Sequence, residues 1–517
     1  MRTRSLCVAI LGIVLAPTIG VSQQASPYVP IDHWAMPFIE HLISAGVIID
    51  PTPDTRPFKQ AQLLHALQAA DTSRASAAAR ATIRRLLSEW AQQDSLPHYR
   101  AEPGIGTQLS TFAFRDPLEL DRGACVTNQC EFQTPGHALS NHAFGQADLD
   151  AEFSFGHVVG VSHLTIDTRL AVDPDWRPVD NTATRFEEAY LSAQWHVGEL
   201  FFGILDRNWG PSVVQGVLLS PNAYSMEHFA ATIGSPGFQL QTWVAELDQR
   251  PDSTGTLVNR YMIQNRIWIH PHGAWTAALE DAAVIAGPGR TLDLWYLNPA
   301  SVTYFRAGTN TEVNDFLDAD FERHAQVTLF GQFMLDDIQA SRNGAANLKP
   351  TSFAWTLGAK GGARSAAMSW TLFYTQVASL TYLNDDNEED PQYFFGDGIG
   401  RQFDDYDQAT AKVSLLVGPT FLLEPEIDVV RQGQGDPHLL HPLVPAYTST
   451  PVLFVGVVER IIHVALGSSW QWRGLTLTGT AGLDFIQNAN NVPGASQTPF
   501  LGSIAVSYHL HHQDRLP

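Results

Sequence analysis

Arg207, Trp209 and Asn222 belong to the most distinctive local motif of the chain, DRNWGP (206–211) followed by LLSPNA (218–223). The planar guanidinium of Arg207 could pair with a carboxylate of an acidic glycan. The indole of Trp209 offers a flat apolar face to a sugar ring, and Asn222 is a tentative third contact. In the structural alternative, which we prefer, Gly210-Pro211 turns an inward-folded loop, and Arg207 pairs with a lumenal acidic row formed by Glu424, Glu426 and Asp428.

A second group of candidate sugar contacts consists of aromatic residues outside the strand patterns. Trp176 and Tyr393 are the tentative glycan contacts in this group. Its other members are Tyr224, Trp295, Tyr296, Tyr382, Phe394 and Phe395. Aromatic faces can stack on sugar rings, but they also form girdles at membrane interfaces or pack loops together. Both interpretations stay open for each residue.

Catalysis is not expected from this sequence. Ser162 and His163 are neighbours on one predicted strand, so their side chains point to opposite faces and cannot cooperate. His163 and Asp167 share a face but have no nucleophile beside them. We therefore predict a protein that is not an enzyme.

Metal or cofactor binding is not expected either. The acidic run 385–390, DDNEED, lacks the spacing and the glycine of a known calcium loop, so we interpret it as a solvated loop. The histidines near the chain end are expected to be solvated as well: His509, His511 and His512. Cys125 and Cys130 are separated by four residues in a polar stretch, which predicts a small disulfide loop in an exported chain.

The elements that must position these side chains are strands with two unlike faces. In residues 408–430, apolar and polar side chains alternate on both sides of a Gly418-Pro419 turn. Period-two alternation is typical of a strand. One face carries Ala409, Ala411, Val413, Leu415, Val417, Phe421, Leu423, Ile427 and Val429. The other face includes an acidic row, Glu424, Glu426 and Asp428, which we predict to line a lumen.

The same alternation recurs from residue 104 to the end of the chain, as at 146–155, 325–335 and 475–485. A soluble barrel or sandwich would bury these apolar faces in one core, larger than single cores become. A transmembrane barrel turns them to lipid and the polar faces to the lumen. Tight turns alternate with long polar connections, as that architecture requires. We predict a mainly β chain: a transmembrane antiparallel β-barrel of about 16–18 strands.

The strand pattern is ambiguous between 206 and 323, where up-and-down counting loses parity. Either 213–219 or 292–305 forms a further strand, or part of the segment folds into the lumen. An inward fold would plug the barrel and argue against a freely conducting channel. A second requirement is that 452–473 form one long strand, so that the chain ends in the periplasm.

Charge and the N-terminus indicate where the chain acts. The formal net charge of -22 at pH 7 argues against a nucleic-acid partner, because phosphate binding needs clustered Lys and Arg. Arg2 and Arg4 precede an apolar run, which predicts a signal peptide over 1–22 with cleavage before Gln23. We expect a Gram-negative outer-membrane protein with a helical segment over 23–103 and a barrel over 104–517.

Residues 23–103 are expected to form a small periplasmic helical segment. Asp32 is expected to cap its first helix and Gly46 to end it, and helices at 60–69 and 75–92 follow. Residues 32–67 resemble one surface-layer-homology-like repeat. Because such modules usually come in threes, we prefer a helical bundle to a cell-wall anchor.

The pattern R-x-W-G-P…L-L-S-x-N-A at 207–223, together with the order of signal peptide, helices and barrel, resembles the Wzi-type capsule assembly family. The resemblance covers essentially the whole mature chain. It implies a monomeric outer-membrane barrel of about eighteen strands. It also implies a lectin-like role without catalysis, in which capsular or extracellular polysaccharide is held at the cell surface. Cell wall or periplasmic export machinery would be the partner on the inner side.

A transport function is the alternative. The chain would then be an outer-membrane porin or substrate-specific channel whose N-terminal module contacts the cell wall. In both cases outer-membrane lipid surrounds the barrel.

Overall fold

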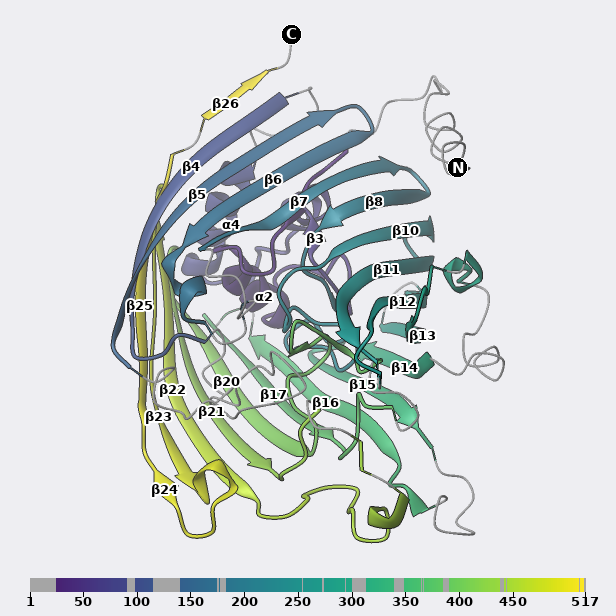
Figure 1. Ribbon diagram of the computed structural model, residues 1–517. Coiled ribbons are helices and arrows are strands. Elements are labelled where there is room, and N and C mark those ends of the chain that lie inside the picture. Colours follow the sequence, from purple (N-terminus) through teal and green to yellow (C-terminus); the bar gives the residue numbers. More distant parts are fainter. Residues whose placement is uncertain are drawn as a thin grey trace.

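The protein is a closed β-barrel (Figure 1). The computed structural model describes residues 25–90, 98–114, 140–173, 176, 183–252, 254–271, 274–292, 294–299, 313–338, 348–363, 365, 367–384, 390–437, 441–442, 444–510 and 512–515. Eighteen long antiparallel strands follow one another around the wall in chain order, and β25 pairs with β4 to close it. The predicted fold class is confirmed, at the upper end of the expected strand count.

The wall strands have the following bounds: β4 (His98–Ser110), β5 (His142–Phe155), β6 (Val158–Asp167), β7 (Thr184–Trp195), β8 (Gly198–Ile204), β10 (Glu227–Ser235), β11 (Phe238–Pro251), β12 (Leu257–Ile269), β13 (Trp275–Gly287), β14 (Val313–Arg323), β15 (Val327–Asp337), β16 (Ser352–Ala363), β17 (Met368–Val377), β20 (Tyr406–Gly418), β21 (Phe421–Gln432), β22 (Glu459–Trp472), β23 (Leu475–Gln487) and β25 (Phe500–His509). The short strands β24 (Ser496–Gln497) and β26 (His512–Arg515) extend the wall at its edges.

Tight turns and longer connections alternate around the barrel. Turns such as those between β5 and β6, β7 and β8, and β20 and β21 lie at one end, which we name the turn end. The connections at the other end, the loop end, include 168–183, 205–226, 378–405 and 433–458. Transmembrane barrels have short periplasmic turns and long extracellular loops. The turn end therefore corresponds to the periplasmic side of such a barrel.

The predicted apolar faces form the outer surface of the wall. On β20 and β21, Val417, Ile427 and Val429 are exposed, whereas Thr410 and Asp428 at alternate positions are buried. Other strands expose Leu149, Ile166, Leu191, Phe333, Phe485 and Ile504 in the same way. Apolar surface of this extent is unusual on a protein in water. It matches the lipid-facing band of a membrane barrel.

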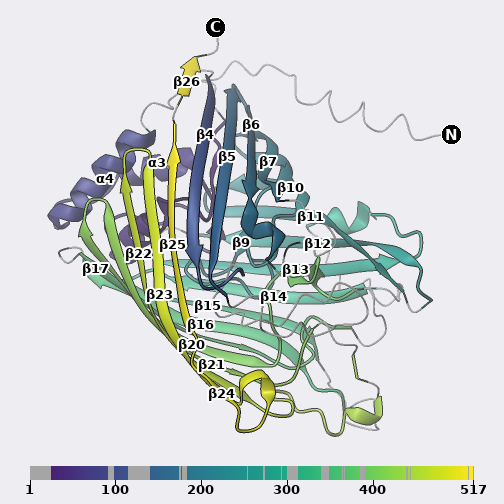
Figure 2. The same cartoon turned by 60° about the vertical axis from the view of Figure 1, so that its left-hand side comes forward.

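The N-terminal segment enters the lumen from the turn end. It contains β1 (Tyr28–Val29), α2 (Met36–Ser44), β2 (Thr55–Arg56), β3 (Phe58–Lys59), α3 (Gln60–Gln68) and α4 (Ala77–Trp90). Thr82 and Arg85 of α4 donate to the carbonyls of Pro419 (3.1 Å) and Gln471 (2.9 Å) at that end (Figure 2). Deeper inside, β2 pairs with β9 (Asn208–Trp209). Among the described residues, no helix is long and apolar enough to span a membrane.

Two local predictions for the first 103 residues need correction. Asp32 does not cap the first helix: α2 begins after Ala35 without a side-chain cap, and proline in its first turn fixes its start. The wall begins earlier than expected, because β4 starts at His98.

The ambiguous region between 206 and 323 contains five wall strands, β10 to β14, which restores parity. Residues 213–219 are not a strand, and the described part of 292–305 contains a 3-10 helix at Leu294–Leu297. The long strand predicted over 452–473 is wrong as well, since β22 spans only Glu459–Trp472. After β6, Leu170 lies in a 3-10 helix (Thr168–Ala171) and is buried.

Candidate functional site

Residues 205–226, the plug loop, fold into the lumen, as one of the two alternatives predicted. Asn208 fixes the start of the loop: its Oδ1 accepts from the N–H of Gly216 (2.7 Å), and its Nδ2 donates to the carbonyls of Val214 (3.1 Å) and Pro211 (3.3 Å). Trp209 pairs with Thr55 through its backbone and bridges to Leu219. The plug loop is therefore held to itself and to the N-terminal segment.

Arg207 is buried where the plug loop, the N-terminal segment and the wall meet. Its Nε donates to Nε2 of His228 (2.9 Å), and its guanidinium lies 4.6 Å from the ring centre of Phe201. The expected pairing of Arg207 with the acidic row is wrong, because the plug loop attaches Arg207 to β8 and β10 and the row lies on β21. Arg207 and Trp209 line a cavity of only about 80 Å³. This arrangement favours the structural role.

The acidic row faces the lumen but has a different partner. Lys412 lies 3.4 Å from Glu424 and 3.6 Å from Glu426. Ser414 donates to Glu424 at 2.8 Å, and Thr410 donates to Asp428. The row is thus neutralised in part from the adjacent strand β20.

A larger cavity, of about 230 Å³, lies between the plug loop and the wall strands β17, β20 and β21. We name it the lumenal cavity. Its lining combines planar polar side chains with aromatic rings and one carboxylate: Asn222, Arg401, Gln402, Gln408, Gln432, Phe373, Phe403, Tyr406 and Glu426. Ligand pockets commonly have volumes of ~300–1,000 Å³. The lumenal cavity is slightly below this range, which suits one small polar unit and not an extended chain.

Two donors of the lumenal cavity have no acceptor among the described residues. Nε of Arg401 and Nε2 of Gln432 are both buried in this state. The other nitrogens of Arg401 donate to Gln215 (3.2 Å) and Thr375 (3.1 Å), so its guanidinium is fixed in place. Buried donors rarely lack a partner, and hydroxyl or carboxylate oxygens of a ligand would supply one.

Asn222 is the one tentative glycan contact that lies in the lumenal cavity. Its Nδ2 donates to the carbonyl of Gly398 (2.9 Å) and to Oε1 of Gln402 (2.8 Å). These bonds join the plug loop to the connection between β17 and β20. Asn222 therefore orders the cavity wall.

Trp176 and Tyr393 lie elsewhere and pack loops. Trp176 meets Tyr224 edge to face at 4.8 Å. The hydroxyl of Tyr393 donates to the carbonyl of Pro437 (2.7 Å), and Arg250 lies 4.6 Å from its ring centre. Burial raises the pKa of Tyr393, so the hydroxyl remains a donor. Tyr224, Tyr296, Tyr382 and Phe394 are also buried, whereas Trp295 is exposed.

Several predicted features lie outside the described residues: Cys125, Cys130, residues 385–389, and the side chains of His511 and His512. The sequence interpretation missed Arg401, Gln402 and Gln432. The run RQFDDYDQ (401–408), which leads into β20, could have indicated them, because it places amide side chains and an arginine beside aromatic rings.

No family model matches the sequence, and no curated protein matches it at a significant level. Among solved structures it is similar to Wzi, an outer membrane protein involved in group 1 capsule assembly in Escherichia coli and described as a carbohydrate-binding β-barrel. The TM-score is 0.62 at 14% identity, covering 93% of this chain and 99% of Wzi.

Two further structures match less well, each with a TM-score of 0.44. OpdQ of Pseudomonas aeruginosa is 9% identical over 80% of this chain and 98% of its own. A BenF-like porin from Pseudomonas fluorescens Pf-5 is 11% identical over 80% of this chain and 99% of its own. At these identities, the likeness concerns the barrel fold alone.

Proposed function

We propose that this chain is a monomeric outer-membrane barrel that holds a capsular or extracellular polysaccharide at the cell surface without catalysis. The observation that carries the proposal is the lumenal cavity, where Arg401 and Gln432 keep buried donors open beside Phe373, Phe403 and Tyr406. Sugars offer hydroxyl oxygens to donors and apolar ring faces to aromatic side chains. The resemblance of residues 207–223 to the capsule assembly family supports the same function.

The lumenal cavity would receive one sugar unit, and the rest of the polysaccharide would lie across the loop end. Arg401 would donate to a hydroxyl or carboxylate oxygen, and an aromatic ring would pack on the sugar. The plug loop makes the back of the cavity through Val214 and Asn222. Its position inside the lumen argues against the alternative, a freely conducting porin.

Retention of polysaccharide by cells tests the proposal. Cells that lack the native gene are complemented with the wild-type chain or with Arg401→Gln, and the surface-bound fraction of polysaccharide is measured against the fraction released into the medium. We expect Arg401→Gln to reduce the bound fraction at least threefold. Arg431→Gln is the matched control, because Arg431 pairs with Asp407 and does not line the lumenal cavity.

Planar bilayers test the transport alternative. The purified wild-type chain should give no steady large conductance. A stable open pore, together with unchanged retention in the Arg401→Gln strain, would contradict the proposed function and favour a channel.

A further inference from the structure

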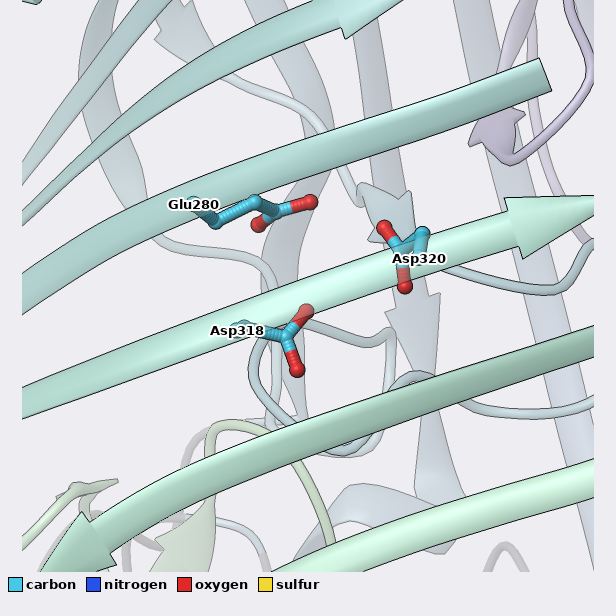
Figure 3. Close-up of side chains that lie close together, drawn as sticks. All are labelled: Glu280, Asp318 and Asp320. Carbon is cyan, nitrogen blue, oxygen red and sulfur yellow. The ribbon is translucent and has the colours of Figure 1, made fainter.

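Three carboxylates converge on the inner face of the wall at β13 and β14 (Figure 3). Glu280 on β13 is the register partner of Asp318 on β14, and Asp320 follows on the same inward face of β14. One oxygen from each lies within 4.8 Å of the other two, and all three residues are buried. We name this group the carboxylate cluster. Side chains that repel one another so strongly need a partner that offsets their charge.

Some oxygens at the carboxylate cluster accept no hydrogen bond from the described residues. Oδ1 of Asp318 and Oδ1 of Asp320 are fully buried in this condition. The amide Oε1 of Gln264 is also buried without a donor, although its Nε2 donates to Glu280. Gln264 itself is 0% exposed. Buried acceptors rarely remain empty, and these three would suit a cation.

The local charge balance gives the valence of that cation. Arg266, itself fully buried, contacts Glu280 at 2.8 Å and Asp320 at 3.1 Å. With all three carboxylates ionised, the one guanidinium leaves two negative charges in a region of low dielectric. Burying such charges is very costly unless they are paired. A divalent cation would make the group neutral.

Lys360 has its own partner outside the carboxylate cluster. It pairs with Glu322 at 3.1 Å.

We propose that Glu280, Asp318 and Asp320 form a calcium site, with Oε1 of Gln264 as an additional oxygen ligand. Three atoms no more than 4.8 Å apart lie at most about 2.8 Å from their common centre. Ca–O bonds measure ~2.3–2.6 Å, so small side-chain movements complete the site. Ca²⁺ accepts irregular sets of carboxylate and amide oxygens. Mg²⁺ keeps several waters in a strict octahedron, which suits a buried site less well.

The calcium site would fasten the interior to the wall. Arg266 also donates to the carbonyl of Asp54 (2.9 Å) and to Thr55 (2.8 Å) of the N-terminal segment. Gln332 donates to Asp318 (2.8 Å) and accepts from the N–H of Val217 (2.9 Å) in the plug loop. Both inner segments therefore touch the carboxylate cluster through one intermediate side chain. Removing the ion should loosen both.

Calorimetry on the purified full chain in detergent, stripped with a chelator, tests the proposal with Ca²⁺ alone. We expect saturable binding of one ion per chain, and at least tenfold weaker binding of Mg²⁺. Asp318→Asn should weaken Ca²⁺ binding at least tenfold. Asp428→Asn is the matched control, a buried lumenal carboxylate that hydrogen-bonds with Thr410 outside the cluster, and it should bind within twofold of wild type.

A second measurement guards against a variant that fails to fold. The wild-type chain should melt at a higher temperature with Ca²⁺ than with chelator, and Tb³⁺ should luminesce on tryptophan excitation. Trp209 lies near enough for this, since the guanidinium of Arg266 lies 5.3 Å from its ring centre. No saturable binding to the wild-type chain, or equal binding by Asp318→Asn and wild type, would overturn the proposal.

Discussion

Replacing an outward side chain of β20 with arginine, and then its inward neighbour, tests the membrane assignment of the barrel. Val413 belongs to the apolar outer face, and Ser414 points into the lumen, where it donates to Glu424 at 2.8 Å. Arginine facing lipid near the midplane costs ~2–4 kcal/mol, which is roughly a 30- to 700-fold change in the folding equilibrium constant. Val413→Arg should therefore lower the free energy of unfolding by about that amount. Ser414→Arg, beside the carboxylate of Glu424, should cost under ~1 kcal/mol.

The assay is equilibrium urea unfolding in phospholipid vesicles, followed by tryptophan fluorescence and by heat-modifiable mobility on gels. Adjacent positions share strand, depth and backbone environment, so the difference between the two variants isolates the face. Thr410 is a poorer inward control, because it is buried and donates to Asp428. Equal destabilisation by Val413→Arg and Ser414→Arg would refute the assignment of faces, and with it the proposed outer-membrane location.

Three further perturbations probe the interior. Burial lowers the pKa of His41 on α2 to about 4, from an ordinary 6.5. The folded chain therefore binds fewer protons than the unfolded chain, so its free energy of unfolding is full above pH 6.5 and should be lower by about 2 kcal/mol at pH 5. Urea titrations above pH 6.5 and at pH 5 should show this difference for the wild-type chain and a much smaller one for His41→Gln. Asn208→Ala removes the bonds that fix the plug loop and should produce brief openings in planar bilayers, which Asn259→Ala, at the loop end, should not. Arg266→Gln removes the guanidinium that pairs with the buried Glu280 and Asp320. It should lower the free energy of unfolding, measured by thermal denaturation, by ~3–5 kcal/mol, whereas Arg323→Gln at the turn end should change it little.

The architecture could be predicted because alternation is local. A strand such as β21 shows its two faces in its own sequence, so Ile427 and Asp428 could be assigned to lipid and lumen without knowledge of their neighbours. The strand count could not be fixed, since 213–219 is as apolar as a strand yet makes the lumen-filling part of the plug loop. Its apolar side chains pack inside the lumen, and the sequence pattern alone does not distinguish such a segment from a wall strand.

The site could be predicted only in fragments. Asn222, Arg401 and Gln432 are far apart in sequence, and only barrel closure brings them to one cavity. The partner of Arg207 was predicted wrongly because the sequence does not show how far apart two inward-facing groups lie around the barrel. The acidic row lies on β21, whereas Arg207 is held against β8 and β10. Glu280, Asp318 and Asp320 were missed for a related reason: each is an ordinary inward polar residue, and their convergence depends on the register between β13 and β14.

The N-terminal segment occupies the lumen of a barrel whose first strand begins only at His98. The inner face of the wall thus binds the N-terminal segment through side chains of β12. Arg266 donates to the carbonyl of Asp54, and Trp268 donates to the carbonyl of Pro53 at 3.2 Å. Fragment complementation should follow from this geometry. A barrel truncated before His98 should regain wild-type thermal stability when residues 25–90 are supplied as a separate polypeptide.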